Sequence, residues 1–112
     1  METPAARPIA CNPTAISSAD RPVYEDLLRR LQAAIREREE LGDGYRFLIA
    51  ANAISLVDTT KWIQWERRCC PFLTFEIRVS GNESDYWLTL SGAAEAKPII
   101  DRALSQKDQT RK

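Results

Sequence analysis

The stretch LTFEIRV, residues 73–79, decides the fold class of this 112-residue chain. Every second residue in it is apolar, namely Leu73, Phe75, Ile77 and Val79. Such alternation is typical of a β-strand that buries one face. Turn-forming residues follow at 80–82, and residues 86–90 form a second apolar run. We therefore expect these two segments to form an antiparallel hairpin.

A helix and a further strand are expected on the N-terminal side of this hairpin. Ser55, with Asp58 three residues later, resembles a capping box, and apolar residues recur at helical spacing up to Cys69. Pro71 disfavours helical geometry at Cys70, so the helix should end there. Before this helix, the apolar residues of 45–51 predict a strand.

Two more helices are expected toward the ends of the chain. From about residue 20 to Leu41, apolar residues recur every three or four positions, and Gly42 follows as a terminator. A last helix is expected over residues 93–104, where Pro98 is tolerated only in the first turn.

These elements predict an α+β fold in two layers. We expect a three-stranded, mainly antiparallel sheet packed against three helices, in the order α-β-α-β-β-α. Residues 8–11 are a candidate fourth strand. The expected organisation is a loose leader at 1–7, a single domain at 8–104 and a polar tail at 105–112.

The composition limits the classes of partner. The chain has 16 basic and 16 acidic residues, so its formal net charge is zero, which suggests neither nucleic acid nor an acidic membrane surface. No apolar run approaches the roughly 20 residues that a membrane-spanning helix needs. Residues 1–6 lack the apolar core of a secretory signal. We therefore expect a cytoplasmic protein that binds neither nucleic acid nor membrane.

Histidine is absent from the sequence. Its absence removes the commonest general base near neutral pH and excludes cysteine–histidine or serine–histidine–aspartate catalysis within one chain. A binding module is therefore favoured over an enzyme, and an enzyme with a cysteine nucleophile is the least favoured function.

The three cysteines, Cys11, Cys69 and Cys70, are the candidate metal ligands. Thiolates prefer soft ions, and three sulfurs fall short of the four that structural zinc normally uses. A soft heavy metal or trivalent arsenic therefore fits better, and zinc would need a fourth ligand. The accessory candidates are Glu66, as a further ligand, and Arg67 and Arg68, whose charge offsets the negative helix end if they point toward the sulfurs.

Other interpretations stay open. The cysteines can pack as small hydrophobic residues in a non-catalytic interaction domain that forms a homodimer. They can also serve redox chemistry, with a disulfide between Cys11 and one of the adjacent pair. Trp62, Trp65 and Trp87 are candidates for a pocket or a dimer interface, where tryptophan is enriched, although helical spacing favours the core for the first two.

The segment WERRCCPFLTF, residues 65–75, resembles a family of small uncharacterised bacterial proteins that carry a Glu-Arg-x-Cys-Cys-Pro-Phe-x-x-Phe motif. The likeness extends to Cys11-Asn12 with Ala15-Ile16, to Asp43-Gly44-Tyr45 and to residues 87–92 with Lys97. Residues 93–95 depart from the Pro-Glu-Gly that relatives often carry. The resemblance implies that all three cysteines belong to the family pattern, but it supplies no mechanism.

Overall fold

The structure is a computed structural model, and it describes residues 12–104. In chain order its elements are η2 (Pro13–Ala15), α1 (Arg21–Ala34), β1 (Ile35–Leu41), β2 (Gly44–Ile49), α2 (Leu56–Cys69), β3 (Thr74–Arg78), β4 (Tyr86–Ser91) and α3 (Ala96–Leu104). Within these residues the fold is α+β, with three α-helices and a four-stranded antiparallel sheet. The expected fold class is confirmed, in its four-stranded form.

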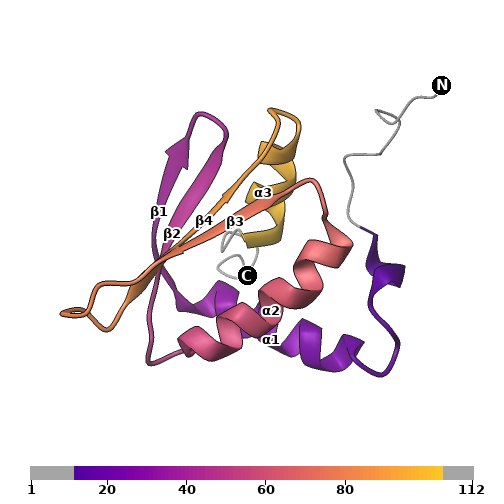
Figure 1. Ribbon diagram of the computed structural model, residues 1–112, viewed down its shortest axis with the longest axis horizontal. Helices are drawn as coiled ribbons and strands as arrows, with labels where there is room; N and C mark the ends of the chain where they lie inside the picture. The colour runs from indigo at the N-terminus through magenta and orange to yellow at the C-terminus, as the bar shows by residue number, and fades with distance from the viewer. Residues whose placement is uncertain (1–11, 105–112) are drawn as a thin grey trace, which may run out of the picture.

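The sheet has the strand order β1-β2-β4-β3, and the helices lie on one side of it (Figure 1). Side chains from α1, α2 and α3, such as Leu31, Trp62 and Ile100, share one buried cluster with Phe47 and Leu88 of the central strands. The sheet therefore has an inner face that forms the core and an outer face without a helix in the described part of the chain.

The prediction of a helix reaching residue 41 is wrong. Helix α1 ends at Ala34, and Ile35–Leu41 form β1, which pairs with β2 through a tight turn. The segment IREREEL misleads because arginine and glutamate favour helices, and its apolar residues, Ile35 and Leu41, stand only at its ends. As an edge strand it keeps its charged side chains exposed, which protects the edge against unwanted pairing.

Strand β1 is thus the fourth strand, and the order of α-helices and strands is α-β-β-α-β-β-α. The other candidate for that strand, residues 8–11, lies outside the described residues. The hairpin of β3 and β4 has the expected antiparallel pairing. Helix α3 begins at Ala96, so Pro98 does fall in its first turn.

Both predicted ends of α2 are confirmed. The Ser55 side chain accepts a hydrogen bond from the Asp58 amide at 3.0 Å, as an N-cap does. Cys70 caps the other end in a non-helical conformation just before Pro71. No helix in residues 12–104 is long and apolar enough to cross a membrane.

Candidate thiol site at the end of helix α2

The candidate site lies where α2 ends. Glu66 and Cys69 belong to the last helical turn, and Cys70 is the residue that caps it. The spacing of four between Glu66 and Cys70 places their side chains on the same face. All three side chains are buried, with relative exposures of 3%, 4% and 0%.

Three potential ligand atoms converge here. A Glu66 carboxylate oxygen and the Sγ atoms of Cys69 and Cys70 all lie within 4.8 Å of one another. Within this group, Cys70 Sγ lies 3.3 Å from Glu66 Oε2. Two sulfurs and one carboxylate oxygen form a donor set that a thiophilic ion can use.

The two cysteines differ in oxidation state. Cys69 is a free thiol, whereas Cys70 is disulfide-bonded in this structure. While Cys70 is in a disulfide, its Sγ has no proton to donate, so the 3.3 Å distance to Glu66 Oε2 is a van der Waals contact. When Cys70 is reduced, its thiol can donate a hydrogen bond to the same oxygen. The third predicted ligand, Cys11, lies outside the described residues.

The segment that follows Cys11 in the sequence packs against the site. The Asn12 amide donates a hydrogen bond to the Cys69 carbonyl at 2.7 Å, and this satisfies one of the free carbonyl groups at the end of α2. Ile16 is buried against both Cys69 and Cys70. A segment that lies more than 50 residues before Cys69 in the sequence therefore packs against the end of α2.

A tyrosine from α1 completes the surroundings of Glu66. Tyr24 Oη donates a hydrogen bond to Glu66 Oε1 at 2.5 Å, across 42 residues of sequence. The sequence analysis did not identify Tyr24. The only signal was its position one helical turn before Leu27 and Leu28, which marks a buried face but no partner.

Burial dominates the electrostatics of the site. It raises the pKa of the Glu66 carboxyl, and the hydrogen bond from Tyr24 opposes this rise. Burial also raises the pKa of the Tyr24 hydroxyl, and the negative charge of Glu66 adds to that effect. The pKa of the Cys69 thiol is raised first by burial and then by Glu66. Cys69 is therefore a protonated thiol at neutral pH and a poor nucleophile.

The predicted role of Arg67 and Arg68 has no support in these contacts. Both side chains are exposed, and Arg67 lines a surface pocket beside Pro71 and Leu73. The positive charge that lowers the Cys69 pKa comes instead from Arg21, at the start of α1. Arg67 and Arg68 are not among the groups that shift the Cys69 pKa, and their expected effect on the thiols stays a prediction.

The three tryptophans have different surroundings. Trp62 is fully buried and packs edge to face on Phe75, with ring centroids 6.1 Å apart, so it is not available to a partner. Trp65 is half-buried and packs against the cluster of Ile16, Cys69 and Cys70. Trp87 is half-buried on β4, beneath the Arg46 guanidinium.

Compared with protein-family models, curated proteins and solved structures, the chain shows no match to any of them.

Proposed function

We propose that the protein is a thiol-based module that binds or senses a soft metal or metalloid ion. In the reduced protein, Cys69 and Cys70 are the sulfur ligands and Glu66 is the accessory ligand. The observation that carries the proposal is the buried group of three donor atoms within 4.8 Å of one another. Burial of a carboxylate beside two sulfurs costs free energy unless a cation or a proton compensates the charge.

Cys11 is proposed as the third sulfur ligand. It directly precedes Asn12, whose amide donates a hydrogen bond to the Cys69 carbonyl. The resemblance to the bacterial family also implies that Cys11 belongs to the family pattern. A reducing cytoplasm, the expected location, keeps such thiols available. A bound cation stabilises thiolates and so overcomes the raised pKa of Cys69, with release of protons on binding.

A cadmium titration tests the proposal. The protein is reduced, freed of reductant under nitrogen and titrated with Cd²⁺ while the ultraviolet charge-transfer band of the metal–thiolate bond is recorded. We expect one tight equivalent, and we expect Cys69→Ser and Cys11→Ser each to weaken it sharply. Glu66→Gln removes the accessory ligand, and Glu95→Gln, exposed just before α3, is its matched control. Binding that is weak in the wild type, or indifferent to both cysteine variants, refutes the metal site and leaves the cysteines as packing residues.

A redox function is the second candidate, because Cys70 is disulfide-bonded while its neighbour Cys69 is a free thiol. We propose Cys11 as its partner, as the sequence suggests. Oxidation removes two protons and two electrons from the two thiols, and glutathione disulfide accepts both to give two glutathione molecules.

Equilibration in glutathione buffers of graded potential tests this candidate. Alkylation followed by mass spectrometry should show three modified cysteines at reducing potentials and only Cys69 modified at oxidising ones. The redox assignment is contradicted if Cys69 and Cys70 resist alkylation to the same extent at oxidising potentials, or if alkylation does not change reversibly with the potential.

A further inference from the structure

The outer face of the sheet carries a row of four side chains, one from each strand. The register pairs Glu37 with Leu48, Leu48 with Trp87, and Trp87 with Arg78. We call this the Leu48 row. Its two central members are apolar and half-buried, although no helix of the described chain covers this face (Figure 1).

The ends of the Leu48 row carry opposite, uncompensated charges. Glu37 and Arg78 are both exposed, and neither forms an ion pair within residues 12–104. The neighbouring row differs, because Glu39 binds Arg46 Nε at 2.8 Å. The Arg46 guanidinium also lies over the Trp87 ring, 4.3 Å from its centroid, and so fixes the indole at the middle of the face.

We propose that this face is the interface of a homodimer. Two copies pack face to face about a twofold axis that runs parallel to the strands, between β2 and β4. Such a rotation exchanges the two sides of the sheet, so Glu37 meets the partner's Arg78 and Leu48 meets the partner's Trp87, each contact occurring twice. A twofold axis across the strands would instead bring the two Arg78 side chains together, which charge repulsion disfavours.

The dimensions agree with this arrangement. Packed sheets stand about 10 Å apart, a gap that an extended arginine and an extended glutamate can bridge together. In the second row, Glu39 faces the partner's Glu76. The charge of Glu39 is already offset by Arg46 of its own chain, whose Nε lies 2.8 Å from it, so this row adds less repulsion than two facing arginines would. The two rows together hold three carboxylates and two guanidinium groups, so a second copy fits the charge pattern better than a polyanion does.

Charge reversal tests the interface. Sedimentation equilibrium over a wide range of concentrations gives the dimer dissociation constant of the wild type. Arg78→Glu and Glu37→Arg should each raise it by at least about tenfold, because each variant places like charges opposite one another at two symmetric positions. The double variant, Glu37→Arg with Arg78→Glu, restores both pairs and should return the constant close to that of the wild type.

Arg102→Glu, on the exposed surface of α3, is the control for Arg78→Glu, because it makes the same change of net charge. Circular dichroism establishes that each variant is folded. A wild type that stays monomeric at the highest concentration overturns the proposal. The proposal is also overturned if the single variants leave the dimer dissociation constant unchanged, or if the double variant does not restore it. None of these results bears on cadmium binding, because the rows and the thiol site lie on opposite faces of the sheet.

Discussion

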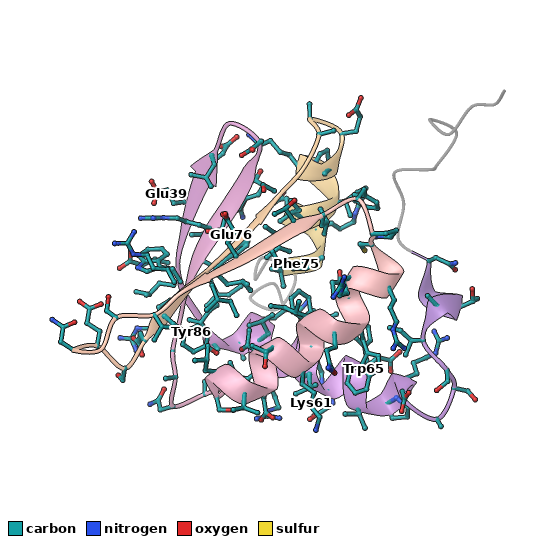
Figure 2. The ribbon with its side chains drawn as sticks, in the orientation of Figure 1. Glu39, Lys61, Trp65, Phe75, Glu76 and Tyr86 are labelled. Carbon is teal, nitrogen blue, oxygen red and sulfur yellow. The ribbon has the colours of Figure 1, made fainter. Side chains whose placement is uncertain are left out.

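Each end of α2 is held by a tyrosine hydroxyl, but in different chemical surroundings. At the N-terminal end, Tyr86 Oη lies 2.6 Å from Thr59 Oγ1 and 3.0 Å from the Ile54 carbonyl. At the C-terminal end, Tyr24 Oη binds the carboxylate of Glu66. Both hydroxyls tie α2 to another element, β4 in the first case and α1 in the second. Figure 2 shows Tyr86 near the N-terminal end of α2.

The first cluster contains only neutral groups that satisfy one another, as is usual in a protein interior. The second buries an ionisable carboxyl beside two sulfurs, and burial raises its pKa. A carboxyl is a costly choice where only a hydrogen-bond acceptor is needed, because a neutral amide accepts the same bond. The comparison therefore supports a structural role for the Thr59–Tyr86 cluster and agrees with the proposed binding role of the Tyr24–Glu66 cluster.

The sharpest way to separate the two clusters is to remove one hydroxyl from each. We expect Tyr24→Phe to lower the cadmium affinity of the reduced protein by about tenfold, because partners that orient a ligand typically contribute 10- to 100-fold. The matched variant Tyr86→Phe should bind cadmium like the wild type. Isothermal titration under nitrogen measures both. Equal affinity of Tyr24→Phe and wild type would mean that the tyrosine does not position Glu66 for an ion.

Stability should show the reverse order. Tyr86→Phe removes the group that links Thr59 to the backbone at the start of α2, and the cost should be about 1 kcal/mol of unfolding free energy. The change is measured by urea denaturation of the reduced, metal-free protein. Tyr24→Phe should cost less free energy of unfolding. The hydrogen bond from Tyr24 lowers the pKa of Glu66, so its loss lets the carboxyl take up a proton, which avoids the cost of an unpaired buried charge. If Tyr24→Phe proves the more destabilising of the two, the division between a structural and a functional cluster fails.

The sequence predicted the parts of this comparison that depend on local patterns. Alternation identified the β3–β4 hairpin, and Ser55 and Pro71 identified the ends of α2. The spacing of Glu66 and Cys70 by four residues made their meeting predictable, because one helical turn sets it.

Long-range contacts were not predictable from the same patterns. The partnership of Tyr24 with Glu66 depends on how α1 packs on α2, which no periodicity specifies. Strand β1 was missed for a related reason. Its residues favour a helix locally, and only pairing with β2 makes them a strand. Trp62 shows that helical spacing identifies a buried face more reliably than it identifies a binding surface.

The smallest expected effect concerns pH. Burial holds the pKa of Glu66 above its ordinary value of 4.5, so the folded protein keeps a proton that the unfolded chain releases as the pH rises past that value. Between the two pKa values the unfolded state binds fewer protons, and the free energy of unfolding of the metal-free protein must therefore fall as the pH rises. Below 4.5 this contribution to stability is fully present.

Glu66→Gln keeps an acceptor for Tyr24 but has no proton to lose, so its stability should lack this decline. Urea denaturation of the reduced protein from pH 4 to pH 8 measures the difference between the two curves, with Glu95→Gln, exposed just before α3, as the control. We expect the advantage of the wild type over Glu66→Gln to shrink steadily with rising pH. Curves that stay parallel would show that Glu66 is ionised in the folded protein like an ordinary surface carboxylate, and the contrast between the two ends of α2 would then lose its electrostatic basis.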